Sequence, residues 1–129
     1  MILLDTHVLV WSLTEERKLS RVAESAIRRS RAAGSLAISA ITMVELAGLM
    51  ERGRLGIQGS IESVLAKFTD DILVLPITLE IAFLTAYFPP DFSRDPSDRI
   101  IAATAQAEGI PLVTADERIQ NCPLVKTIW

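Results

Sequence analysis

Residues 2–9 read Ile2-Leu3-Leu4-Asp5-Thr6-His7-Val8-Leu9, and this stretch indicates the fold class. Its first three side chains form a short apolar run, which is typical of a buried strand. An acid follows at once, and residues 8–13 then have the spacing of a short helix. A strand that leads directly into a helix is the repeating unit of a parallel α/β sheet.

The same alternation continues along the rest of the chain. Further strands are predicted at 36–39, 73–75, 112–114 and 124–128, and further helices at 20–33, 42–52, 60–68, 79–87, 95–108 and 115–120. Strands joined through helices form right-handed units, and their parallel sheet is covered by helices on both faces. The length of 129 residues predicts that 1–129 is a single domain.

The composition excludes several kinds of site. Cys122 is the only cysteine, so the chain has neither an internal disulfide nor a cysteine cluster for zinc. His7 is the only histidine, so a His-rich metal site is also excluded. The N-terminus lacks the form of a secretory signal, and no apolar stretch is long enough to cross a bilayer. We therefore expect a soluble, cytoplasmic protein.

The charge and the apolar content point to partners. Hydrophobic residues make up 50% of the chain and charged residues 22%, so part of the apolar surface is expected to be covered by a partner or a second copy. The net charge of −3 argues against a generally basic nucleic-acid binder. It does not exclude a nuclease, because an acidic metal site lowers the total.

Four acids follow predicted strands or open predicted helices: Asp5, Glu45, Asp98 and Asp116. In a parallel sheet these positions share one edge, so the four side chains should converge there. Several carboxylates at one point repel each other unless a cation neutralises them, and oxygen-only sites suit hard ions such as Mg²⁺ or Mn²⁺. The set predicts a metal-dependent phosphodiesterase site.

Two of these acids also have a purely structural interpretation at the start of a helix. Asp5 can cap the helix that follows it, by accepting a hydrogen bond from a backbone amide. Glu45 can form a capping box with Thr42, three residues before it. Either interpretation accounts for the residue type without a metal.

The other two acids differ in this respect. Asp98 lies in the first turn of a helix opened by Asp95 and Pro96, where the helix dipole favours negative charge. Near the fourth acid, Thr114 and Glu117 have the spacing of a capping box, which leaves Asp116 without a structural role. Capping explains single acids, but it does not require all four to lie on one sheet edge.

Four segments together resemble the motifs of PIN-domain proteins. They are Ile2-Leu3-Leu4-Asp5-Thr6-His7-Val8-Leu9-Val10-Trp11, Ser39-Ala40-Ile41-Thr42-Met43-Val44-Glu45-Leu46, Arg94-Asp95-Pro96-Ser97-Asp98-Arg99-Ile100-Ile101-Ala102-Ala103-Thr104-Ala105 and Pro111-Leu112-Val113-Thr114-Ala115-Asp116-Glu117. Each is weak alone, but the four occur in order over nearly the whole chain. Within that family the chain resembles the small VapC-like toxins of type II toxin–antitoxin modules.

This resemblance implies a fold, an activity and partners. The fold is a Rossmann-like three-layer α/β/α sandwich with a central, mainly parallel sheet. The activity is that of an Mg²⁺- or Mn²⁺-dependent endoribonuclease, which cleaves RNA through metal-activated water. The implied partners are RNA, a second copy in a homodimer, and a cognate antitoxin that covers the active-site groove.

The same resemblance assigns roles to single residues. Asp5, Glu45, Asp98 and Asp116 fall on the family's catalytic positions. Asp5, Asp98 and Asp116 would hold the metal, and Glu45 would bind it through water or orient the attacking water. Thr114 falls on a position that often holds a hydroxyl near the metal. Asp95 lies beside the third motif, and we interpret it as a helix cap.

Other polar residues are candidates for RNA contacts. Arg94 and Arg99 flank Asp98 and are placed to contact phosphates. The basic run from Arg17 to Arg31 is either a solvated helix face or part of an RNA surface. His7 is expected to be a packed or hydrogen-bonded core residue, and Trp11 to belong to the core or to a partner surface.

Other functions fit the sequence less well. A receiver domain requires a phospho-accepting Asp after the third strand, where this chain has Pro76. A haloacid-dehalogenase-type phosphatase requires Asp-x-Asp after the first strand, where this chain has Asp5-Thr6-His7. A PIN-domain nuclease of RNA processing without a toxin role and a non-catalytic interaction module remain as alternatives.

Overall fold

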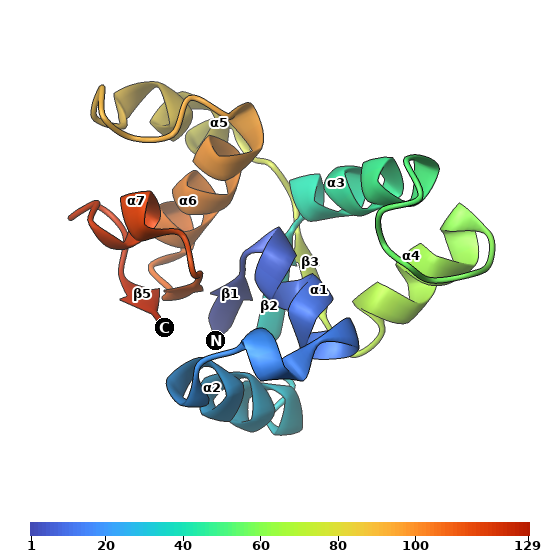
Figure 1. Ribbon diagram of the computed structural model, residues 1–129. Helices are drawn as coiled ribbons and strands as arrows, with labels where there is room; N and C mark the ends of the chain where they lie inside the picture. Colours follow the sequence, from blue (N-terminus) through green and yellow to red (C-terminus); the bar gives the residue numbers. More distant parts are fainter.

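The computed structural model describes residues 1–129 and alternates strands with helices from end to end (Figure 1). The strands are β1 (Ile2–Leu4), β2 (Leu36–Ser39), β3 (Leu73–Leu75), β4 (Leu112–Val113) and β5 (Thr127–Ile128). The α-helices are α1 (Thr6–Thr14), α2 (Arg21–Ala32), α3 (Ala40–Glu51), α4 (Ile61–Thr69), α5 (Leu79–Leu84), α6 (Pro96–Glu108) and α7 (Glu117–Gln120). The short 3-10 helices η1 (Glu16–Lys18) and η2 (Thr85–Tyr87) follow α1 and α5.

All five strands pair in parallel, in the order β3-β2-β1-β4-β5. The chain builds outwards from β1 through β2 to β3, then returns to the other side of β1 to add β4 and β5. The connections that follow β1 and β4 therefore lead away in opposite directions. Such a reversal opens a crevice at the carboxyl ends of the two strands, where ligands bind in open α/β sheets.

The apolar side chains of β1 separate two halves of the core. Leu4 points to one face and packs in a cluster with Val8 and Phe68, and Leu3 points to the other face with Ile101. This alternation follows from the pleat of a strand. Helices α1, α2 and α4 thus cover one face of the sheet, and α5, α6 and α7 cover the other (Figure 1). The predicted three-layer sandwich is confirmed.

Side-chain caps explain where several helices begin. Ser20 accepts a hydrogen bond from the Ala23 amide at the start of α2, and Asp95 accepts one from Ser97 at the start of α6, both as predicted. Helix α6 ends at Gly109, which has a φ of 64°. Only glycine adopts that left-handed conformation without a steric cost, so the chain can turn there into β4.

Two predicted capping boxes are wrong. Helix α3 begins directly after β2, because Ser39 caps it, and Thr42 is already inside the first turn. Thr42 therefore forms no capping box with Glu45. Helix α7 is capped by Asp116, which accepts a hydrogen bond from the Arg118 amide, so the Thr114–Glu117 box is absent as well. Asp116 thus has a structural role as the N-cap of α7, although the sequence predicted none.

The last strand is shorter than predicted. It covers only Thr127–Ile128 instead of 124–128, because its sole neighbour β4 offers two residues for pairing. The predicted helix at 79–87 is divided in a similar way, with α5 ending at Leu84 and the tighter η2 completing it. Neither difference changes the order of the elements.

Some apolar side chains stay outside the core. Leu79, Phe83 and Tyr87 are exposed along α5 and η2, and the rings of Phe83 and Tyr87 meet edge to face. The composition predicted such a surplus. None of the helices combines the length and apolar character that crossing a lipid bilayer requires.

Candidate active site

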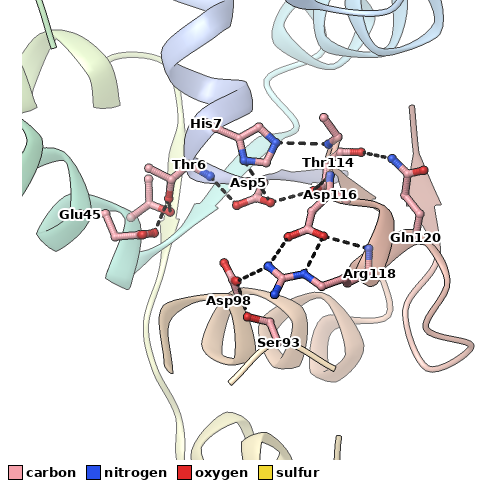
Figure 2. Close-up of polar contacts among 12 residues, drawn as sticks. Asp5, Thr6, His7, Glu45, Ser93, Asp98, Thr114, Asp116, Arg118 and Gln120 are labelled. Atoms are coloured by element: carbon pink, nitrogen blue, oxygen red, sulfur yellow. Dashed lines mark hydrogen bonds and ion pairs between the residues drawn. The ribbon is translucent and has the colours of Figure 1, made fainter. Parts of the chain in front are cut away.

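The four predicted acids lie at the carboxyl edge of the sheet (Figure 2). Asp5 follows β1 and Asp116 follows β4, so these two flank the point where the strand order reverses. Glu45 lies in the second turn of α3, which begins where β2 ends. Asp98 lies in the first turn of α6, whose amino end reaches the same edge.

Asp5 is the most deeply buried of the four, with an exposed fraction of 4%. Its Oδ1 accepts a hydrogen bond from the Thr6 amide at 2.8 Å, which is the predicted helix cap. Its Oδ2 accepts a hydrogen bond from the Thr114 hydroxyl at 2.7 Å. Each carboxylate oxygen thus has a further lone pair, so capping and ligand binding are compatible at this residue.

His7, in the first turn of α1, contacts the segment that follows β4. Its Nε2 accepts a hydrogen bond from the Ala115 amide at 3.2 Å, so that nitrogen carries no proton. Its Nδ1 lies 3.4 Å from Oδ2 of Asp5. His7 is hydrogen-bonded, as the sequence predicted, but it is half-buried rather than a core residue.

Thr6 connects Asp5 to Glu45. The Thr6 hydroxyl donates to Oε1 of Glu45 at 2.6 Å, and it lies 3.0 Å from the Thr42 hydroxyl. Because Thr6 uses its proton on Glu45, Thr42 must donate to Thr6. This chain of hydrogen bonds fixes the direction of the Glu45 carboxylate relative to α1.

The Glu45 carboxyl is a weaker acid than an ordinary glutamate. Burial raises its pKa, and the hydrogen bond from Thr6 opposes that rise. The negative charges of Asp5, Asp95 and Asp98 add to the rise. The site therefore concentrates carboxylates that repel one another.

Asp98 is in a similar electrostatic position. The Ser93 hydroxyl donates to its Oδ2 at 2.6 Å and orients it. Burial nevertheless raises the pKa of Asp98, against the effect of the Ser93 hydrogen bond, and the charges of Asp5, Asp95 and Asp116 raise it further. A cation bound among these groups would offset both the burial of the Asp98 charge and its repulsion by the neighbouring acids.

Asp116 differs because a cation already faces it. Nη2 of Arg118 lies 3.1 Å from Oδ2 of Asp116, and Nε lies 3.4 Å from Oδ1 (Figure 2). Burial raises the pKa of Asp116, but the hydrogen bonds and the charge of Arg118 outweigh that effect and hold the pKa below its ordinary value. The same Nη2 lies 3.7 Å from Oδ2 of Asp98.

Arg99, a predicted phosphate contact, is engaged elsewhere. Its Nε donates to the Ser93 carbonyl at 2.8 Å, and its Nη1 donates to the Thr85 carbonyl at 2.9 Å. Its guanidinium also lies over the ring of Phe92. These contacts hold the loop that positions Ser93 beside Asp98, so Arg99 orders the site rather than faces it. Arg94 is exposed on the same loop.

The basic run from Arg17 to Arg31, in η1 and α2, fits the interpretation as a solvated helix face. Arg17 and Lys18 pair with Glu15, and Arg28 pairs with Glu24, all near the surface. Lys18 differs from the other basic residues of this run because it lies near the ring of Trp11 and lines the cleft beside the acids.

A cleft of about 380 Å³ opens beside the acids. It is lined by Asp5, Thr6, His7, Val10, Trp11, Glu15, Lys18, Glu45, Leu49, Arg54, Leu55 and Asp98. Trp11, which we expected in the core or at a partner surface, thus forms part of the candidate site. A second cavity of about 390 Å³ between α1 and α2 contains none of the four acids, so size alone does not mark the site.

The donor set fits a hard divalent ion, though the carboxylates do not form a ready-made cage. No three His, Cys, Asp or Glu side chains lie close enough together to hold an ion as they stand. A cation at this edge is favoured because the donors are all oxygens and because the carboxylates repel one another. The guanidinium of Arg118 already lies close to two of these carboxylates. Asp5, Asp98 and Asp116 would hold the ion after drawing closer.

Sequence reasoning missed the residues that orient the acids. They are Thr6, Ser93 and Arg118. Gln120 was missed as well, and it donates to the Thr114 carbonyl at 2.9 Å. Only Arg118 had a local signal, because a basic residue two positions after a capping Asp can fold back onto it. The partners of Thr6 and Ser93 depend on how the helices dock.

Comparison with known proteins places the chain in a family. A family model for the PIN domain matches residues 2–123. This chain belongs to the PIN-domain family. It is 36% identical over 130 residues to Ribonuclease VapC22 of Mycobacterium tuberculosis, a match that covers 99% of this chain and 98% of that protein.

Solved structures show the same fold. FitAcB from Neisseria gonorrhoeae is 25% identical with a TM-score of 0.69, over 98% of this chain and 96% of that one. A toxin-antitoxin complex from Klebsiella pneumoniae is 21% identical with a TM-score of 0.65, over 97% of this chain and 95% of that one. The second likeness is evidence for the fold alone.

Thr6→Val should lower RNA cleavage by about tenfold, because Glu45 loses the hydroxyl that directs it while the shape of the side chain is kept. Thr6→Ser is the matched control, since serine keeps the hydroxyl, and its rate should stay near that of the wild type. Single-turnover cleavage of one RNA substrate measures both. Equal rates for the two variants would show that the Thr6–Glu45 hydrogen bond has no part in catalysis.

Proposed function

We propose that this protein is an endoribonuclease toxin of a type II toxin–antitoxin pair, with Mg²⁺ or Mn²⁺ as its cofactor. The relative with 36% identity over nearly its full length is named a ribonuclease. The observation that carries the proposal is the gathering of four carboxylates where the strand order reverses. Hydroxyl groups and backbone amides orient all four, as a preorganised site requires.

The chain's own residues would divide the work. Asp5, Asp98 and Asp116 would hold the ion, with Asp5 fixed by Thr6 and Thr114. When bound, the ion supplies Lewis-acid activation of water and of the scissile phosphate. Glu45 would bind the ion through water or orient the attacking water, with its carboxylate directed by the Thr6 hydroxyl. Direct attack by water leaves a 5′-phosphate and a 3′-hydroxyl.

The proposed partners are an antitoxin and a second copy of the chain. Val44, on α3 next to Glu45, is 65% exposed, so a protein that covers the acids would also bury apolar surface there. The exposed side chains of α5 and η2 offer a separate surface for a second copy. Sedimentation of the purified chain, alone and with the protein encoded next to it, tests both, and a monomer under both conditions would refute them.

Cleavage of a structured RNA pool tests the activity. Purified protein should cut with Mg²⁺ or Mn²⁺ and should be inactive in EDTA, because the carboxylates alone cannot stabilise a leaving oxygen. Mapping the product ends tests the mechanism in the same experiment. A 2′,3′-cyclic phosphate would contradict it, since that product shows attack by the ribose hydroxyl. Cleavage that continues in EDTA would contradict the metal dependence.

A further inference from the structure

Arg118 reaches two carboxylates that come from different elements. Its own amide donates to Oδ1 of Asp116 at 2.9 Å, and its Nη2 contacts Oδ2 of the same residue at 3.1 Å. That nitrogen also lies 3.7 Å from Asp98, which belongs to α6. One guanidinium therefore lies between the two acids proposed to share a metal (Figure 2).

The Arg118 side chain has no evident packing role. It is 59% exposed, whereas the Asp98 and Asp116 side chains that it contacts are 21% and 20% exposed. Helix α7 has only four residues, and the Asp116 carboxylate caps it through a backbone amide whether or not the guanidinium is present. The two negative charges hold the side chain at this position.

A guanidinium and a divalent ion cannot share this position. Mg²⁺ binds carboxylate oxygens at about 2.0–2.1 Å, whereas Nη2 lies 3.1 and 3.7 Å from the two oxygens. An ion ligated by both acids would draw them closer than the intervening nitrogen allows. The two positive charges would also repel each other at that separation.

We propose that Arg118 is an internal counter-ion of the Asp98–Asp116 pair, which a divalent cation must displace in order to bind. The inference rests on the proposed metal-dependent function. The apparent dissociation constant for the ion equals the intrinsic one divided by the fraction of time that the guanidinium is disengaged. The Arg118 guanidinium neutralises part of the negative charge of the two carboxylates when no metal is bound.

Direct measurement of Mn²⁺ binding tests this. The free ion can be followed by electron paramagnetic resonance as it is titrated with the full-length, EDTA-treated protein. Arg118→Gln should lower the dissociation constant by about five- to tenfold, because nothing then competes for the two acids. Arg118→Lys keeps the charge but not the planar fork, so its dissociation constant should fall between those of Arg118→Gln and the wild type.

The matched control is Arg94→Gln. Arg94 is exposed near the same edge and contacts no carboxylate, so its loss measures only the general effect of removing a positive charge. An Arg118→Gln variant that binds Mn²⁺ within twofold of Arg94→Gln, or more weakly than the wild type, would overturn the proposal. Failure of every variant to bind metal would remove the proposed function together with it.

The melting temperature gives a second readout that does not depend on cleavage. A ligand that binds the native state stabilises it in proportion to the logarithm of its concentration over its dissociation constant. At equal Mg²⁺, Arg118→Gln should therefore gain more in melting temperature than Arg94→Gln. Equal gains would again count against displacement, while still leaving metal binding itself established.

Discussion

Asp5→Asn is expected to lower the rate of RNA cleavage by about 10³-fold, equivalent to about 4 kcal/mol of barrier, and to leave the fold intact. Asp5 is the most buried acid of the site and flanks the reversal of strand order. Asparagine caps a helix as well as aspartate does, so the hydrogen bond from the Thr6 amide survives. The variant removes the negative charge, and its amide nitrogen, in place of Oδ2, no longer accepts the hydrogen bond from the Thr114 hydroxyl.

Asp95→Asn is the matched control for this prediction. It removes an equal charge from the same edge, and asparagine again preserves the cap, which Asp95 provides to the Ser97 amide. Its cleavage rate should stay close to that of the wild type. The measurement is single-turnover cleavage at saturating Mg²⁺, with circular dichroism melting as the check on folding. Equal rates for Asp5→Asn and Asp95→Asn would exclude Asp5 as a ligand.

Asp98→Asn should change activity and stability in opposite directions. Cleavage should fall by about 10²-fold, because one of the three proposed metal ligands loses its charge. In EDTA at neutral pH the variant should melt higher than the wild type by about 2–5 °C. Burial and three neighbouring acids disfavour the Asp98 carboxylate, and an amide relieves both while still accepting the hydrogen bond from Ser93.

The raised pKa values of Glu45 and Asp98 set a direction for the pH dependence. A carboxyl whose pKa is higher in the folded chain binds protons on folding, so it favours the folded state at low pH. That contribution is fully present below the ordinary values of 4.5 and 3.8 and is lost as the pH rises through the raised values. Asp116 acts oppositely, and its contribution is lost only as the pH falls below 3.8.

Thermal melts in EDTA from pH 7 down through the ordinary values of 4.5 and 3.8 test this contribution. As the pH falls, the stability of the wild type should change more favourably than that of a variant that combines Glu45→Gln with Asp98→Asn. The difference between the two slopes isolates the pair from the other acids of the chain. Parallel slopes would mean that neither carboxyl is perturbed in the folded protein.

The sequence determined the architecture because its signals are local. Apolar runs such as Ile2–Leu4, each followed by helical spacing, define strands and helices without reference to distant residues. Once the strands are parallel, their carboxyl ends must share one edge, so residues that follow strands gather there. The placement of Asp5 and Asp116 on either side of one crevice follows from that rule.

The tertiary structure alone decided which side chains orient the acids. Thr6 and Glu45 are 39 residues apart, and Thr114 and Asp5 are 109 apart, yet each pair shares a short hydrogen bond. Such bonds need two side chains within about 3 Å and in good alignment. That geometry exists only after α1 and α3 have docked and β4 has paired with β1.

The two mistaken capping boxes have the same origin. A Thr-x-x-Glu spacing is compatible with a capping box at a helix start. Here Ser39 and Asp116 occupy the N-cap positions of α3 and α7 instead. Thr42 and Thr114 were left free to bind Thr6 and Asp5. The sequence by itself determined the order of the elements and the edge at which the acids gather. The docking of the helices decided how each acid is held and that Arg118 lies between two of them, because directional contacts between distant residues have no local pattern.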